Sequence, residues 1–296
     1  GNMANYVLSC CSTADLTVEH LRRRNISFVC FHFSLDGVEY ADDMGQSMAI
    51  HTFYEKMIAG AETSTSQVSV GEFCEYFTGL LSAGNDVLHI CLSSGLSGSY
   101  FSAVSAAEMM KEQFPDRKIY VVDSLCASSG YGLFMDGLAD QRDKGLDLEA
   151  LRDWAEENKL RMQHWFFSTD LKWYVKGGRV SAPAGFIGGI LGICPVLHMD
   201  AEGHLIPFAK ARTKKKAIKA VVDQMIALAD GGTDYNGKCY ICNSYCLDDA
   251  RATAELVEKT FPYLNGAVEI YDIGTVIGSH TGPGTISIFF WGSPRE

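Results

Sequence analysis

A small-residue turn between a predicted strand and a predicted helix carries a dense set of chemically useful groups. An apolar strand pattern precedes the turn and an Ala-rich helix pattern follows it. The first N–H groups of a helix have no internal partners, and the helix dipole adds partial positive charge there. Such a turn can hold a phosphate or a carboxylate without any lysine. The turn contains Ser93, Ser94, Gly95, Ser97 and Gly98.

The spacing of these residues leaves the ligand open. It does not match Gly-x-x-x-x-Gly-Lys-Ser/Thr or Gly-x-Gly-x-x-Gly, so a nucleotide is not indicated. It also lacks the Gly-x-Ser-x-Gly pattern of a hydrolase nucleophile elbow. The local pattern therefore predicts either an anion site or a serine-capped turn with no ligand.

Length, charge and cysteine content narrow the function classes. A chain of 296 residues is long for one core, so we expect two domains. The net charge of −11 argues against nucleic acid or an anionic membrane as partner. Any bound anion must then be held by local donors. The ten cysteines come without a secretory signal, so we expect a reduced, cytoplasmic setting.

Two further patterns bear on a metal site and on a membrane span. Cys239, Cys242 and Cys246 could suggest a metal, but no second pair with zinc-like spacing follows and the segment alternates like a strand. We therefore expect no metal and no cofactor. The apolar run 182–197 is interrupted by prolines and glycines and is too short to cross a bilayer, so no integral membrane segment is expected.

The order of predicted elements gives the fold class, α/β. Strands and helices alternate as far as residue 160, which predicts a parallel sheet with helices on both faces. A hairpin over 195–209 then predicts an α+β second part. The expected domains are 3–160 and 161–296. Ligands bind such sheets at the carboxyl ends of the strands.

Some local expectations can be tested directly. Residues 26–33 are predicted to form one strand. The polar run 62–69 has the composition of a solvated loop, and 278–284 that of a turn. Ser69 and Glu72 have the spacing of a capping box in front of a helix.

Six short motifs occur in an order that resembles the DegV family, the fatty-acid-binding subunits of bacterial fatty acid kinase. The resemblance covers essentially the whole chain. Cys10 and Cys11 depart from it, because Asp and Ser are usual after the first strand. The motifs are Thr65-Ser66-Gln67, Ser93-Ser-Gly-Leu-Ser97-Gly-Ser-Tyr100, Val122-Asp-Ser124, Lys176-Gly-Gly-Arg179, Lys210-Ala-Arg-Thr213 and Ser279-His-Thr-Gly-Pro-Gly284.

The resemblance implies a two-domain protein that binds a long-chain fatty acid in a tunnel between the domains. A separate ATP-dependent kinase subunit would phosphorylate the presented carboxylate, so this chain would be a carrier and not the enzyme. The carboxyl group would be held by Thr65 and Ser97. Ser66, Gly98, Arg212 and His280 complete the ligand-binding set that the motifs imply.

The residue types also leave other interpretations open. Ser97 and His280 could act as nucleophile and base in a serine-based acyl hydrolase or phosphotransferase, although no acidic orienting residue can be identified. Lys176 and Arg179 fit either an anion site or cations at the end of a helix. The acidic charge argues against a DNA-binding regulator. Candidate tunnel residues are Phe186, Ile187, Ile190, Leu191, Phe289, Phe290 and Trp291.

Overall fold

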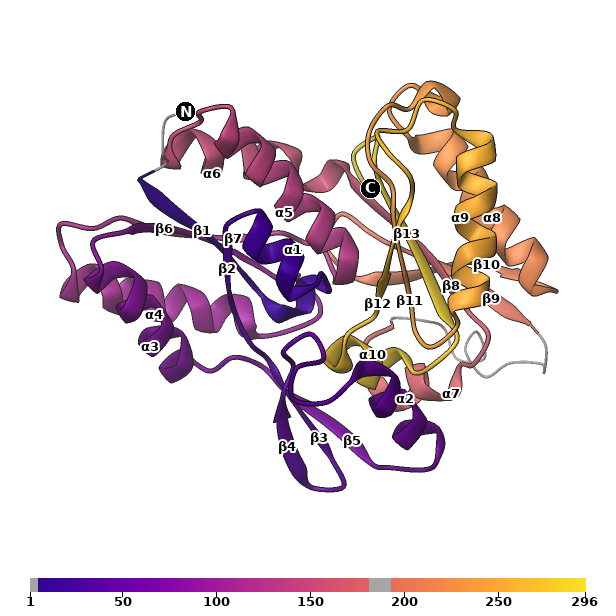
Figure 1. Cartoon of the computed structure of the whole chain (residues 1–296), viewed down its shortest axis with the longest axis horizontal. Helices are drawn as coiled ribbons and strands as arrows, with labels where there is room; N and C mark the ends of the chain where they lie inside the picture. The colour runs from indigo at the N-terminus through magenta and orange to yellow at the C-terminus, as the bar shows by residue number, and fades with distance from the viewer. Residues whose placement is uncertain (1–4, 181–192) are drawn as a thin grey trace.

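The computed structural model describes residues 5–180 and 193–296, which fold into three sheets with helices packed around them (Figure 1). Two sheets use strands that precede residue 160, and the third uses strands that follow it. None of the helices in these ranges is long and apolar enough to cross a membrane.

The first sheet is fully parallel, with strand order β2-β1-β6-β7. Helices α3 and α4 cover one face, and α1, α5 and α6 lie on the other (Figure 1). This confirms the predicted sheet with helices on both faces. The strands are β1 (Tyr6–Cys11), β2 (Ile26–Val29), β6 (Asp86–Cys91) and β7 (Ile119–Asp123). The helices are α1 (Val18–Arg23), α3 (Val70–Ser82), α4 (Ser99–Gln113), α5 (Ser128–Asp143) and α6 (Leu148–Asn158).

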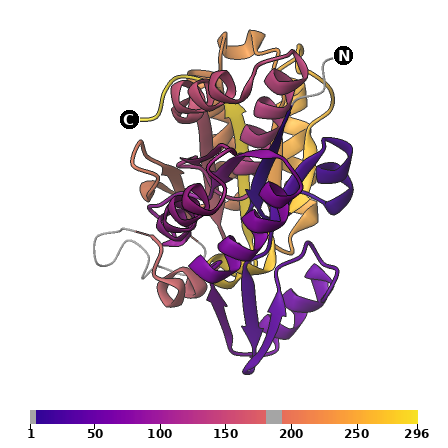
Figure 2. The same cartoon turned by 90° about the vertical axis from the view of Figure 1, so that its left-hand side faces the viewer.

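A small antiparallel sheet of order β4-β3-β5 projects from this core together with helix α2 (Ile50–Ile58) (Figure 2). It corrects two expectations. The single strand over 26–33 divides into β2 and β3, which belong to different sheets. The expected loop at 62–69 contains β5. The strands are β3 (His32–Leu35), β4 (Val38–Ala41) and β5 (Thr63–Ser66).

The segment 62–69 contains a strand because β5 pairs with β3. Thr65 lies opposite Phe33 in the ladder between β5 and β3, and β-branched threonines suit an extended backbone. A polar run therefore becomes a strand once a partner supplies its backbone hydrogen bonds. The predicted capping box is confirmed: Ser69 Oγ accepts the Glu72 N–H at 3.1 Å, and the Glu72 carboxylate accepts the Ser69 N–H at 3.1 Å.

The third sheet is mixed, with order β10-β9-β8-β13-β11-β12, and it contains the predicted β9–β10 hairpin. The expected turn at 278–284 is partly helical, because α10 continues to Thr281. The strands are β8 (Met162–Ser168), β9 (Cys194–Met199), β10 (Leu205–Ala211), β11 (Tyr240–Asn243), β12 (Glu269–Asp272) and β13 (Thr285–Trp291). The helices are α7 (Lys172–Gly177), α8 (Lys214–Leu228), α9 (Leu247–Thr260) and α10 (Thr275–Thr281), and 3₁₀ turns occupy Ser12–Ala14, Lys159–Arg161 and Gly232–Asp234.

Alternation along β13 gives this sheet two different faces. Ile286, Ile288 and Phe290 pack into a core beneath α8 and α9. Thr285, Ser287 and Phe289 point to the opposite face, where α5 crosses β8, β11 and β13 (Figure 1). The inner face of the third sheet therefore looks towards the parallel sheet.

A buried carboxylate joins the two large sheets. Asp136 on α5 is 1 % exposed and lies 2.8 Å from His20 Nε2 and 3.2 Å from Arg24 Nη1. The Tyr240 hydroxyl on β11 also donates to Asp136. A buried charge with several donors is costly to leave half-satisfied. Asp136 therefore fixes α5 against both the α1 region and the third sheet.

We predict that Asp136→Asn lowers the free energy of unfolding by about 3 kcal/mol, because it removes the negative charge that its buried donors face. Urea denaturation followed by circular dichroism measures this. Asp140→Asn is the matched control: Asp140 also pairs with Arg24, but its side chain is 53 % exposed. The control should lose less than about 1 kcal/mol. Equal losses in both variants would contradict the role given to Asp136.

Candidate ligand-binding site

A cavity of about 740 Å³ lies where the three sheets meet. This volume is in the range of small-molecule sites, roughly 300–1,000 Å³. One wall is a stripe along α10, formed by residues at positions i, i+3, i+4 and i+7 of a helical repeat. These residues are Ile273, which directly precedes the helix, Val276, Ile277 and His280. The wall is apolar except at the His280 end.

The inner face of the third sheet forms another wall. Phe166 on β8 and Phe289 on β13 line the cavity, as expected for Phe289 from the sequence. Phe290 and Trp291 do not line it: Phe290 points into the core beneath α8 and α9, and Trp291 packs against Trp154. The other expected tunnel residues, Phe186, Ile187, Ile190 and Leu191, lie outside the described residues.

Two residues that are far apart in sequence meet at the polar end. Thr65 Oγ1 on β5 lies 2.8 Å from His280 Nε2 on α10. The other ring nitrogen, Nδ1, is 3.3 Å from the Gly177 carbonyl oxygen, which can only accept. In a neutral ring, Nδ1 therefore carries the proton and Nε2 accepts the Thr65 hydroxyl.

Burial, followed by the nearby positive charge of Arg179, lowers the pKa of His280, while the Gly177 carbonyl acts in the opposite direction. The shift is downwards from an ordinary value of 6.5. The ring is therefore neutral at neutral pH in the ligand-free protein. A group that brings negative charge to this end would shift the pKa in the opposite direction, because a nearby opposite charge favours the protonated ring.

The Ser-rich turn follows β6 as predicted and is held from two sides. Asp123, at the end of β7, accepts the Ser94 N–H at 3.1 Å. The Ser93 hydroxyl donates to the Gly203 carbonyl at 2.8 Å. A Cβ on Gly95 would lie 2.6 Å from the same carbonyl oxygen, so only glycine allows the turn to approach the β9–β10 hairpin this closely.

Ser97 directs its hydroxyl to the start of α4. Its Oγ accepts the Ser99 N–H at 3.1 Å and lies 3.2 Å from Ser99 Oγ. Gly98 is exposed beside it, and a Cβ there would lie 2.8 Å from Gln67 Oε1. The Ser-rich turn and the Thr-Ser-Gln segment therefore lie next to each other at the exposed end of the cavity, with the Gln67 side chain beside Gly98.

Five of the six predicted ligand-binding residues line this one cavity: Thr65, Ser66, Ser97, Gly98 and His280. Arg212 is exposed just beyond the end of β10 and is not among the described lining residues. The structure thus brings together the hydroxyls and the histidine but not the predicted cation.

Arg179, whose motif fits either an anion site or a helix end, lines the cavity. Its Nε donates to the Leu96 carbonyl at 3.1 Å, and its Nη1 donates to the Gly177 carbonyl at 2.8 Å. Helix α7 does end here, with Gly178 in the left-handed region at φ 64°. The helix-end interpretation was therefore correct for the backbone. The same turn carries the Arg179 side chain to the cavity.

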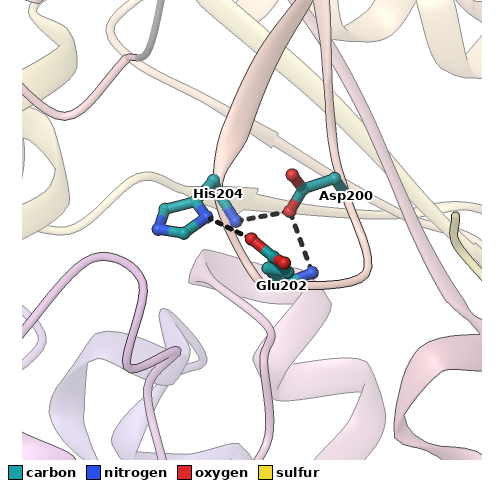
Figure 3. A group of neighbouring side chains, drawn as sticks. All are labelled: Asp200, Glu202 and His204. Carbon is teal, nitrogen blue, oxygen red and sulfur yellow. Dashed lines mark hydrogen bonds and ion pairs between the residues drawn. The ribbon is translucent and has the colours of Figure 1, made fainter.

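One group of potential metal ligands occurs among the described residues, in the β9–β10 turn (Figure 3). Asp200 Oδ1 accepts the N–H groups of Glu202 at 3.0 Å and His204 at 2.9 Å, and His204 Nδ1 is 3.7 Å from a Glu202 oxygen. Glu202 is exposed. These contacts are those of an aspartate-stabilised turn, and the contacts alone do not indicate a bound ion.

Comparisons with known proteins agree with this architecture. A family model described as "Uncharacterised protein, DegV family" matches residues 11–292. A DegV domain-containing protein of Clostridium perfringens is 33 % identical over 99 % of this chain and 100 % of its own length.

Two solved structures are similar over nearly the whole chain. A structure titled as fatty acid binding of a DegV family protein from Thermus thermophilus has a TM-score of 0.86 and 27 % identity, covering 98 % of this chain and 100 % of its own. DegV from Bacillus subtilis, titled a fatty acid binding protein, has a TM-score of 0.81 and 26 % identity, with the same coverage. On the extent of the family match and the full-length similarity to its relatives, this chain belongs to the DegV family.

Proposed function

We propose that this protein binds a long-chain fatty acid, with the carboxylate at Thr65 and Ser97 and the hydrocarbon inside the cavity. The observation that carries the proposal is the asymmetry of the cavity. Hydroxyls and His280 gather at one end, and the α10 stripe continues from them as an apolar wall. The similar proteins from Thermus thermophilus and Bacillus subtilis, both described as fatty acid binding, support the same ligand class.

The polar end can hold an anion through neutral donors. Ser97 lies at the N-terminus of α4, where helix N–H groups and the dipole favour negative charge. Arg179 adds a cation at the rim of a protein whose net charge is −11. Such a local cation offsets the repulsion between the carboxylate and the acidic protein.

Protonation of His280 would strengthen binding of the carboxylate at this end. With both ring nitrogens protonated, Nε2–H donates to Thr65 Oγ1, and Nδ1–H continues to donate to Gly177. The Thr65 hydroxyl is then free to turn from the ring to the carboxylate. The ligand's charge thus favours the protonated ring, and the protonated ring releases a donor for the ligand.

The hydrocarbon supplies most of the free energy of binding. Burying one CH₂ group contributes roughly 0.8 kcal/mol, so a chain of about 16 carbons could gain on the order of 10 kcal/mol before entropy costs. Phe166, Val276, Ile277 and Phe289 provide apolar contacts for it. Binding of a free long-chain acid therefore needs only a modest contribution from the head group.

We further propose that the protein is a carrier of two domains, 3–160 and 161–296, with the ligand between them. The cavity supports this division because its lining residues come from both ranges. Ser66, Gly98 and Arg179 are exposed at the polar end. A separate ATP-dependent kinase subunit could thus reach the carboxylate without unfolding the carrier. A cytoplasmic location would match such a partner.

The alternative, a serine-based acyl hydrolase or phosphotransferase, is supported less well by the same contacts. A base that activates Ser97 should lie within hydrogen-bond reach of its hydroxyl. His280 Nε2 instead faces Thr65, and Nδ1 faces a carbonyl in place of an orienting carboxylate. Turnover of acyl esters that disappears in Ser97→Ala would reverse this preference.

The direct test is to purify the full chain, extract it with organic solvent and analyse the extract by mass spectrometry. We expect a fatty acid in roughly stoichiometric amount, because burial of the chain slows its release. Delipidated protein should then bind palmitate or oleate in a titration. Protein that carries no fatty acid and also binds neither acid would overturn the proposed function.

We predict that the double variant Thr65→Ala, Ser97→Ala binds palmitate at least 30-fold more weakly, since a hydrogen bond to a charged group contributes about 1.5–3 kcal/mol. Isothermal titration calorimetry measures the change. Ser64→Ala is the control, because Ser64 adjoins Thr65 on β5 but is exposed and bonded to Ser34. Unchanged affinity in the double variant would remove these residues from the site.

We also predict that palmitate affinity increases as the pH falls from about 8 towards about 6, because histidine side chains titrate in this range. The sign follows from the pKa of His280, which is lowered in the free protein and raised when an anion binds. Binding therefore takes up a proton between these two pKa values. Calorimetry in buffers of different ionisation enthalpy detects that uptake, and His280→Gln should abolish it. If the wild-type protein binds palmitate without taking up a proton, the proposed coupling between ligand binding and protonation of His280 is wrong.

A further inference from the structure

We propose that the inner part of the cavity contains a second polar subsite, formed by Ser287 and Ser128, which recognises a hydroxyl group on the hydrocarbon chain. The preferred ligand would be a long-chain fatty acid hydroxylated near mid-chain. This inference rests on the proposed function and refines it, because it names a chemical feature of the ligand beyond its carboxylate.

Ser287 is the main observation. It is 7 % exposed, lines the cavity, and lies on the inner face of β13 between Thr285 and Phe289. Within the described ranges, its hydroxyl has no oxygen or nitrogen partner, and its one hydrogen-bonding neighbour is the Cys242 sulfur on β11. A thiol is a weak donor and a weak acceptor. Ser287 therefore presents a buried hydroxyl whose hydrogen-bonding capacity is largely unused.

Ser128, at the start of α5, lies beside the same cysteine and completes the subsite. Its Oγ lies 3.5 Å from the Cys242 sulfur and donates to Asp15 Oδ2 at 2.6 Å. It lines the cavity and is 6 % exposed. Its single hydrogen is committed to Asp15, so what remains for a ligand is an acceptor lone pair. A ligand hydroxyl could donate to Ser128 and accept from Ser287.

The subsite is separated from the carboxylate end by the length of α10. Asp15, the partner of Ser128, lies against Gly274 at the start of that helix, and His280 is near its end. The seven helical steps from Ile273 to His280 span roughly 10 Å at 1.5 Å per residue. A long-chain acid with its carboxylate at Thr65 would thus pass the subsite with carbons well removed from the head group.

A plain hydrocarbon chain would form no hydrogen bonds with Ser287 and Ser128, whereas a chain with a hydroxyl group at this position would. Burying a hydroxyl in an apolar cavity without a partner is unfavourable. Two buried serines remove that penalty at one position along the chain. The cavity should therefore tolerate or favour a hydroxyl at that position and disfavour it where only Val276, Ile277 or Phe289 faces it.

The test compares three ligands on delipidated full-length protein by competition binding: stearic acid, stearic acid hydroxylated near mid-chain, and stearic acid hydroxylated near the methyl end. We expect the mid-chain isomer to bind at least as tightly as stearic acid, and the methyl-end isomer to bind more weakly. Ser287→Ala should weaken the mid-chain isomer about 5-fold and leave stearic acid unchanged or slightly tighter.

Ser105→Ala, at an exposed serine on α4, is the matched control and should change none of the three affinities. The inference is overturned if wild-type protein binds stearic acid tenfold or more tightly than the mid-chain isomer, or if Ser287→Ala weakens both ligands equally. The ligand comparison on wild-type protein decides the matter even if the variant does not fold. Failure to bind any of the three acids would instead overturn the proposed function.

Discussion

The hydrogen bond between Thr65 and His280 is the contact on which the polar end of the cavity depends. It joins a strand of the small sheet to the helix that connects β12 and β13 of the third sheet, across 215 residues of sequence. Neither group carries a full charge in the free protein, because burial and Arg179 keep the pKa of His280 low. A neutral pair that can become charged when an anion arrives avoids the cost of an unpaired buried ion in the empty cavity.

Helix α10 places this pair relative to the rest of the cavity. Its first turn is held by buried carboxylates: Asp42 accepts the Thr275 hydroxyl at 2.8 Å, and Asp15 accepts the Gly274 N–H. Burial raises the pKa of Asp42 to about 6. Its last turn carries His280. A short helix fixed at its N-terminus thus sets the distance between the inner part of the cavity and the carboxylate end.

The sequence was sufficient for features that depend on local pattern and short motifs. The alternation up to residue 160 predicted the parallel sheet, and the Ser-rich turn was correctly placed after β6. The family motifs indicated Thr65, Ser97 and His280, which the structure brings to one cavity. The local sequence pattern did not predict features that depend on contacts with distant parts of the chain. The polar run at 62–69 forms β5 only because β3 lies beside it, and Arg179 reaches the cavity only through the turn at Gly178.

Binding of a fatty acid, as proposed, would draw on two separate parts of the cavity. In the proposed binding mode the carboxylate would lie at β5, the start of α4 and the end of α10, whereas β8, β13 and the start of α5 form the inner wall. Substitutions at Ser287 or Phe166 can therefore change which chain fits without disturbing Thr65 or Ser97. If neutral donors and Arg179 hold the head group as proposed, the apolar wall is the part of the cavity that can vary most freely. The proposed binding mode therefore assigns ligand selectivity mainly to the inner face of the third sheet.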